Sequence, residues 1–333
     1  MLPLNDLLWK QLDDAHRDRD IPELLSRLAK AWDDETANSL LYDCLCHQET
    51  CYGATYAAIP HLLKIAQPDG NRHQRLQIAV FSGFVTLCAF KTRQSQCGEV
   101  ESRPLQGLPL TPEAWDRKLD CFRSLLAGLE NPDDRSRYEL VVLRPRYKRI
   151  LALGPVHAGD LDKIRSIRAN FFSSLPTIRA TCERALLENL QDEDAVRCLL
   201  SGIAAADGIL GLARLLNLGP QGQFGCSSCN CEHEYILFGD RVAIYTDEDE
   251  PPPADAAACG RDRALLDYKE HAPSRSDGFM VPVADGEALE GRATALLSLA
   301  DRAQSPEPAL LLRSFLGSFL CRRCGANGPV SAV

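Results

Sequence analysis

Four cysteines in two Cys-x-x-Cys pairs are the residues of this chain best suited to chemistry. The first pair is Cys226 and Cys229. The second pair is Cys321 and Cys324, which Gly325 follows directly. Four thiolates are the ligand set of a structural zinc site, in which two such pairs meet from distant parts of the sequence. The sequence therefore predicts a zinc ribbon, with no open metal position for water or substrate.

The first pair lies beside two further candidate ligands, Cys231 and His233. A local site of three cysteines and one histidine is therefore an alternative, as is exchange of one predicted ligand for either residue. We favour the split site because the local site leaves Cys321 and Cys324 without a role. Oxidised pairs without metal are the remaining alternative.

Composition predicts a cytoplasmic protein. The chain has 333 residues, 14 cysteines and a formal net charge of −9, and its length indicates about two domains. Its first residues, Met-Leu-Pro-Leu-Asn-Asp, carry neither a basic region nor an apolar signal stretch. The longest nearly apolar run, residues 79–90, is too short to span a bilayer. We therefore expect no membrane segment.

Charge is unevenly distributed, and the net negative charge argues against a general nucleic-acid-binding protein. An acidic loop that suits a basic partner precedes three prolines: Asp247, Glu248, Asp249 and Glu250. The segment between Arg135 and Arg149 instead holds six basic residues against one acidic residue, with Tyr138 and Tyr147 interleaved. It could form part of a groove for a duplex. The alternative for both segments is a solvated surface.

Residues 1–218 show apolar residues at helical spacing. One such stripe joins Ile21, Leu25, Leu28 and Trp32. We expect helices to begin near residues 21, 37, 52, 71, 112, 135, 160, 175, 192 and 208. These starts pair up at very roughly 35 to 45 residues, which is compatible with HEAT-like repeats. A single helix pair cannot bury its apolar faces alone and must stack on similar pairs, so the pattern predicts a HEAT-like α-solenoid.

Residues 219–333 follow a different pattern. A β-hairpin is predicted over residues 235–245, with Gly239 and Asp240 as its two-residue turn. Residues 249–285 form an acidic, proline-rich excursion. Helices over residues 286–304 and 308–320 then return the chain to Cys321. The fold class is therefore mainly α, with a helical domain over residues 1–218 and a zinc-ribbon module over residues 219–333.

One segment near the N-terminus carries a resemblance. His47-Gln48-Glu49-Thr50-Cys51-Tyr52 precedes small residues and then Ala58-Ile59-Pro60-His61-Leu62. This resembles the His-Gln-Gly-Thr-x-Tyr and Ala-x-Pro-x-Leu pattern of a group of bacterial HEAT-like repeat proteins, with Glu49 in place of Gly. Some members of that group look like toxin-immunity proteins. The resemblance implies a binding scaffold.

The chemistry of the same segment predicts a helix junction, in which His47 and Gln48 end one helix and Thr50 caps the next. Alternatives make Cys51 a nucleophile activated by His47, or place a metal between His47 and His61. Aromatic side chains with polar tips suit a contact surface. The predicted partner-binding residues are therefore His47, Gln48, Tyr52, Tyr56, Asp247, Glu248, Asp249 and Glu250.

These patterns together favour binding over catalysis. We expect a protein without a catalytic centre that binds another protein, most specifically an immunity protein that blocks a bacterial toxin by steric occlusion. The toxin would be encoded by a neighbouring gene, and acidic residues would speed its encounter if it is basic. Nucleic-acid binding through residues 135–149 is the alternative function.

Overall fold

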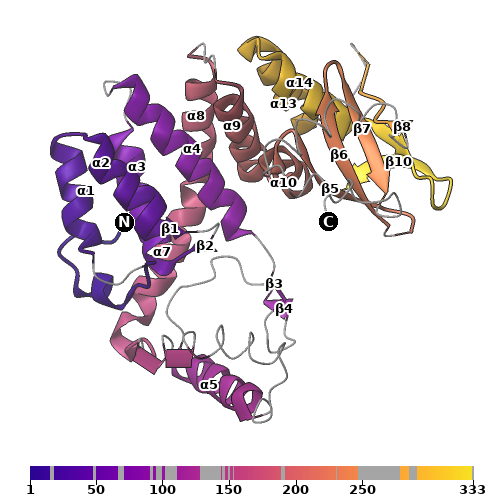
Figure 1. The fold of residues 1–333 in the computed structure, drawn as a ribbon. Coiled ribbons are helices and arrows are strands. Elements are labelled where there is room, and N and C mark those ends of the chain that lie inside the picture. Colours follow the sequence, from indigo (N-terminus) through magenta and orange to yellow (C-terminus); the bar gives the residue numbers. More distant parts are fainter. Residues whose placement is uncertain are drawn as a thin grey trace, which may run out of the picture. The chain divides into compact units, whose positions relative to one another are not determined.

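The structure, a computed structural model, is mainly helical and divides into two compact units, Met1–Thr177 and Ile178–Val333 (Figure 1). Among the residues it describes, no helix is both long enough and apolar enough to cross a lipid bilayer. The described residues are 1–15, 19–47, 50–66, 71–90, 93–94, 100–101, 111–127, 144, 147–148, 151–152, 154–188, 192–229, 231–246, 278–284 and 291–331.

The first unit consists mainly of helices. Their bounds are η1 Leu7–Gln11, α1 Ile21–Lys30, α2 Asp34–Asn38, η2 Ser39–Leu45, α3 Gly53–Ile65, α4 Arg72–Ala89, α5 Pro112–Ala127, η3 Ala158–Asp160 and α7 Leu161–Ser173. Two short antiparallel ladders interrupt them: β1 Cys46–His47 with β2 Thr50–Cys51, and β3 Arg93–Gln94 with β4 Val100–Glu101. Helix α3 packs against α1, α4 and α7 and so forms the centre of this unit.

Side-chain caps explain why several helices begin where the sequence predicts. The Asp20 carboxylate accepts a hydrogen bond from the Glu23 N–H at 3.1 Å, and Asp192 accepts one from the Ala195 N–H at the same distance. Each bond satisfies a backbone donor that the first turn of a helix leaves without a partner. Helix α2 begins three residues before the predicted position 37, and residue 135 lies outside the described residues.

The helix junction predicted at His47 and Gln48 was wrong. The π-helix η2 ends at Leu45, and the chain becomes extended at Cys46 to form β1 and β2 of a tight hairpin. Thr50 therefore lies in a strand, and the N-cap residue of α3 is Tyr52. At the base of the hairpin, the Thr55 hydroxyl donates to the Leu45 carbonyl and accepts from the Tyr52 N–H. A side chain of α3 thus joins both ends of the hairpin.

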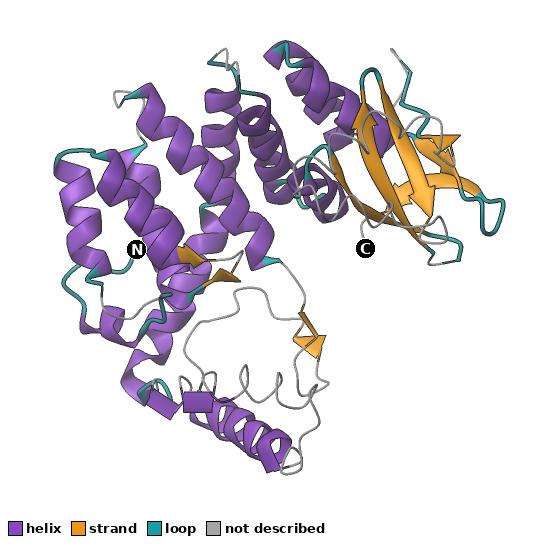
Figure 2. Cartoon of the chain, viewed as in Figure 1, coloured by secondary structure: helices purple, strands orange, loops and turns teal. Residues whose placement is uncertain are grey.

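The second unit contains helices and one sheet (Figure 2). Its helices are α8 Leu175–Leu186, α9 Glu193–Ala206, α10 Leu210–Leu218, α13 Gly291–Ala303 and α14 Pro306–Leu316. Its strands are β5 Gln221–Cys226, β6 Glu232–Phe238, β7 Arg241–Thr246, β8 Gly278–Phe279, β9 Ser318–Leu320 and β10 Asn327–Ser331. Because α10 packs on β5 and on α14, the division between units lies earlier than the predicted boundary at residue 218.

The predicted hairpin is confirmed as β6 and β7, with Phe238 opposite Arg241 and Gly239 at a φ of 58° in the turn. It belongs to a larger antiparallel sheet with strand order β8-β7-β6-β5-β10-β9. The two ends of this sheet also meet. Val281, just beyond β8, exchanges backbone hydrogen bonds of 2.8 and 3.0 Å with Ser318 of β9. This single bridge joins the two edges of the sheet at one point and satisfies the backbone groups of Val281 and Ser318 there.

The sheet packs on α14, which contacts both β7 and β10 although β6 and β5 separate those strands. Tyr235 of β6 meets Phe315 of α14 edge to face, with ring centroids 5.1 Å apart. Its hydroxyl lies 3.1 Å from the Gly219 carbonyl oxygen and 3.2 Å from that of Leu215. A buried tyrosine thus joins the sheet to α14 through its ring and to the end of α10 through its hydroxyl.

The close approach at Gly317 yields a test of this packing. A Cβ at Gly317 would overlap the carbonyl oxygen of Val281, in the bridge that joins the sheet edges. We expect Gly317→Ala to lower the free energy of unfolding by about 1–3 kcal/mol, measured by chemical denaturation. Gly328→Ala in β10 is the matched control, because its Cβ would meet only the Ser227 hydroxyl at 3.8 Å. Equal effects of both substitutions would contradict the close approach.

Candidate metal centre

Two adjacent hairpins position the predicted cysteines. Cys226 ends β5 before the turn into β6, and Cys321 follows β9 before the turn into β10. Strands β5 and β10 are hydrogen-bonded neighbours, with Cys226 opposite Val330. Because these strands are antiparallel, both turns project from the same end of the sheet. Pairing of β5 with β10 therefore brings together two loops that lie more than 90 residues apart in sequence.

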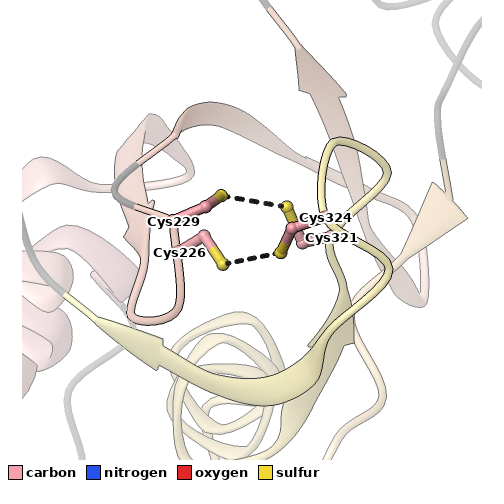
Figure 3. A group of neighbouring side chains, drawn as sticks. All are labelled: Cys226, Cys229, Cys321 and Cys324. Carbon is pink, nitrogen blue, oxygen red and sulfur yellow. Dashed lines mark hydrogen bonds between the residues drawn. The ribbon is translucent and has the colours of Figure 1, made fainter.

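The four sulfur atoms face one another across these loops (Figure 3). The Cys226 and Cys324 sulfurs are 3.8 Å apart, and the Cys229 and Cys321 sulfurs are also 3.8 Å apart. All four lie within 4.8 Å of one another. Four thiolates arranged as a tetrahedron at about 2.3 Å from a zinc ion are separated by about 3.8 Å. The cluster therefore has the size that a tetrahedral metal ion requires, and its sulfurs are too far apart for disulfides, which need about 2.05 Å.

The two loops repeat one backbone pattern. The N–H of Cys226 donates to the Cys231 carbonyl at 2.9 Å, and the N–H of Cys321 donates to the Ala326 carbonyl at the same distance. Gly325 has a φ of 71°, a conformation that glycine adopts without the cost that a Cβ brings. Gly325, which follows the second cysteine of its pair, therefore stands where that conformational freedom is needed.

Backbone donors and the other thiols set the ionisation of the cluster. Burial raises the pKa of Cys226, but hydrogen bonds from the Ser228 and Cys229 N–H groups and from neighbouring thiols outweigh it, so this pKa falls to about 7. The Cys231 N–H lowers the pKa of Cys229, yet burial and the neighbouring thiols raise it to about 12. The Cys226 thiolate thus forms readily, whereas a metal ion must displace the proton of Cys229. Metal affinity will therefore fall with decreasing pH.

The alternative ligands Cys231 and His233 do not join this cluster. The Cys231 sulfur lies 3.9 Å from the Arg323 guanidinium and donates to the Glu232 carbonyl at 3.4 Å. The His233 ring is 1% exposed and stacks on Phe224, with ring centroids 5.3 Å apart. By strand alternation it shares a face of β6 with Tyr235, and it also packs on Phe319, with ring centroids 5.2 Å apart. The local three-cysteine, one-histidine site is therefore not formed.

An aromatic layer under the cluster was not predicted from the sequence. Phe224 and Phe319 pack edge to face, with centroids 4.8 Å apart, and both are buried. Each phenylalanine stands two residues before the first cysteine of a pair, so the chain repeats Phe-x-Cys-x-x-Cys. In a strand, residues two apart share a face, which places both rings beneath the thiols. This repeat was the signal that could have revealed the layer.

The predicted partner-binding residues are only partly described. Tyr56 does not lie on a contact surface: it is 1% exposed and packs edge to face on Phe171 of α7, with centroids 5.3 Å apart. This corrects the prediction, and the reason is that α3 is buried on several sides. Tyr52 is half-buried before α3, and His47 lies in β1. The others lie outside the described residues: Gln48, Asp247, Glu248, Asp249 and Glu250.

The chemical alternatives for the same segment gain no support. Hydrogen bonds between the Cys51 thiol and the sulfurs of Cys46 and Cys88, together with burial, favour the protonated form and raise the pKa of Cys51 well above its usual range, which is the opposite of an activated nucleophile. The His61 Nε2 atom hydrogen-bonds the Leu2 carbonyl at 2.8 Å, and burial lowers the pKa of this imidazole. His61 thus fastens the N-terminal segment to α3.

The basic segment bounded by Arg135 and Arg149 is described only at residues 144, 147 and 148. Tyr147 packs near Phe122 of α5, with ring centroids 6.4 Å apart, and its hydroxyl accepts from Arg123 at 3.3 Å. One of the two interleaved tyrosines therefore contacts α5.

No family model, no curated protein and no solved structure matches the chain. The resemblance to HEAT-like repeat proteins therefore stays a prediction.

Replacement of one cluster cysteine tests the site. We expect the purified chain to hold about one zinc ion, measured by mass spectrometry of the metal. Cys324→Ser should release it and destabilise the second unit by several kcal/mol, because metal affinity is coupled to folding. Cys231→Ser is the matched control in the neighbouring loop. It should keep the ion and change stability by about 0.5 kcal/mol or less.

The opposite pattern would contradict this assignment. If Cys231→Ser released the ion and Cys324→Ser retained it, the ligands would come from the first loop alone. A chain purified under reducing conditions without any bound metal would exclude a structural ion.

Proposed function

We propose that this protein is a binding scaffold, most specifically an immunity protein that neutralises a bacterial toxin by steric occlusion. The observation that carries the proposal is the packing of successive helices into pairs with very short connections. Three residues separate α9 from α10, two separate α13 from α14, and the two helices of each pair pack on each other. Such pairs are the repeating unit of HEAT-like solenoids, which present extended, stiff surfaces to macromolecules. We infer that the helices of this chain form such a solenoid.

Zinc is the ion that we propose for the four-cysteine cluster. Four thiolates in a tetrahedron suit zinc, and a cluster with four protein ligands is closed to substrate. Its role is therefore to hold the two hairpins of the sheet together. A stiff sheet supports α10 and α14, whose side chains pack on it, so the ion contributes rigidity to a surface instead of chemistry.

Charge supports a basic protein as partner. The chain carries a formal net charge of −9. A surface of one sign raises the rate of encounter with an oppositely charged protein by about tenfold to a thousandfold at low salt, and added salt removes this gain. The same charge weighs against nucleic acid, whose phosphates would be repelled.

Co-expression with the product of the adjacent gene tests the function. We expect a one-to-one complex that survives gel filtration, and an association rate that falls about tenfold or more between low and high salt. Because occlusion involves no turnover, inhibition should be complete at one chain per toxin. It should not increase with longer incubation.

Three outcomes would oppose the proposal. If the product of the adjacent gene never co-elutes with this chain, it is not the partner. Complete inhibition of the toxin by much less than one equivalent of this chain would indicate an enzyme. Salt-sensitive binding to a mixed-sequence duplex, with no bound protein, would favour the nucleic-acid alternative.

A further inference from the structure

Three thiols meet in the first unit, away from the metal centre. Cys46 lies in β1, Cys51 lies in β2 and Cys88 lies in the last turn of α4, which packs on β2. The Cys51 thiol is hydrogen-bonded to both of the others. All three are also close enough to the buried Tyr56 hydroxyl to influence its ionisation. Cys51 is therefore the central member of a row of three sulfurs.

The hairpin register suits a covalent bond between two of them. Cys46 and Cys51 are direct partners across the antiparallel ladder. Directly opposite residues in such a ladder have Cα atoms about 4.5–5.5 Å apart, and disulfides join Cα atoms about 4.4–6.8 Å apart. A bond between Cys46 and Cys51 therefore needs no change in the path of the backbone.

Exposure distinguishes the third thiol. Cys46 is 6% exposed and Cys51 is 8% exposed, whereas Cys88 is partly open to solvent. A dissolved oxidant thus meets Cys88 more easily than either hairpin thiol. The three sulfurs also differ from the metal centre, because they do not form a group with mutual distances short enough for one ion within the described part of the chain.

We propose that Cys88, Cys51 and Cys46 form a thiol relay, in which oxidation enters at Cys88 and ends as a disulfide between Cys46 and Cys51. The relay closes the base of the hairpin that carries His47. It is independent of the function proposed above, because it rests only on contacts within the first unit.

The chemistry balances with a small disulfide, such as oxidised glutathione, as the oxidant. The Cys88 thiolate attacks the oxidant, forms a mixed disulfide and releases one glutathione thiol. The Cys51 thiolate then attacks the Cys88 sulfur and releases the second glutathione thiol. Finally, the Cys46 thiolate attacks the Cys51 sulfur, which frees Cys88 as a thiol. Two protein thiols are oxidised, one oxidant disulfide is reduced to two thiols, and the two protons leave with them.

The ionisation of Cys51 sets the pace of this relay. Hydrogen bonds between its thiol and the sulfurs of Cys46 and Cys88, followed by burial, favour the protonated form and raise its pKa well above that of an ordinary thiol. The attacking species is the thiolate, so at pH values below that pKa the fraction able to react grows about tenfold with each unit by which the pH rises. The reduced state is therefore persistent near neutral pH, and the exchange accelerates steeply in mildly alkaline solution.

Peptide mapping after oxidation tests the relay. We expect full-length, metal-loaded protein treated with oxidised glutathione to accumulate the Cys46–Cys51 disulfide, identified by fragmentation mass spectrometry. Cys88→Ala should slow its formation at least about tenfold, because the accessible thiol is lost. Cys46→Ala should instead accumulate a Cys51–Cys88 disulfide. Cys44→Ala is the matched control, since it removes a buried thiol two residues from Cys46 and should leave the rate unchanged.

Two results would overturn the proposal. In the wild-type protein, a stable mixed disulfide at Cys88 with Cys46 and Cys51 still reduced would show that no transfer occurs. An unchanged rate in Cys88→Ala would show that oxidation does not enter there. The wild-type map decides the identity of the pair even if a variant fails to fold, and Cys88→Ser provides a second, more conservative test of entry.

Discussion

Hydrogen bonding between β5 and β10 is the interaction on which the second unit depends. It aligns two hairpins whose turns each carry a Cys-x-x-Cys pair, and it places both turns at one end of the sheet. Without that pairing, the four sulfurs have no reason to meet. With it, they form a cluster whose 3.8 Å separations match a tetrahedral ion. An ion held there would in turn fix the register of the two hairpins, because a one-residue slip of either strand would move its cysteine to the opposite face.

The layer beneath the thiols follows from the same strand geometry. Phe224 and Phe319 share the face of their cysteines because they precede them by two residues. Strand alternation also places His233 against Phe224, within the aromatic packing and away from the cluster. Which residue can join the cluster is therefore decided by its position along the strands, because His233 lies opposite Phe224, two residues before Cys226 and away from the turn. The chemistry of its side chain alone would have made His233 a candidate ligand.

The first unit shows how a short irregular segment can carry reactive groups inside a helical framework. The π-helix before Cys46 and the hairpin after it interrupt the regular succession of helices. Such interruptions often accompany functional positions, because they aim side chains in directions that a regular helix does not allow. Here the interruption sets Cys46 opposite Cys51 and brings both to the last turn of α4. Tyr56, expected at the surface, instead fills the core below them.

The sequence alone determined the positions of most helices, the β6–β7 hairpin and the four cysteines of the cluster, because apolar periodicity, capping residues and turn residues act locally. Tertiary structure decided everything that depends on strand partners. It joined Val281 to Ser318, added β5 and β10 to the predicted hairpin, and turned the expected helix junction at His47 into a strand. Neither a strand's neighbour nor the burial of Tyr56 is encoded within a few residues, since both arise from contacts with segments far away in the chain.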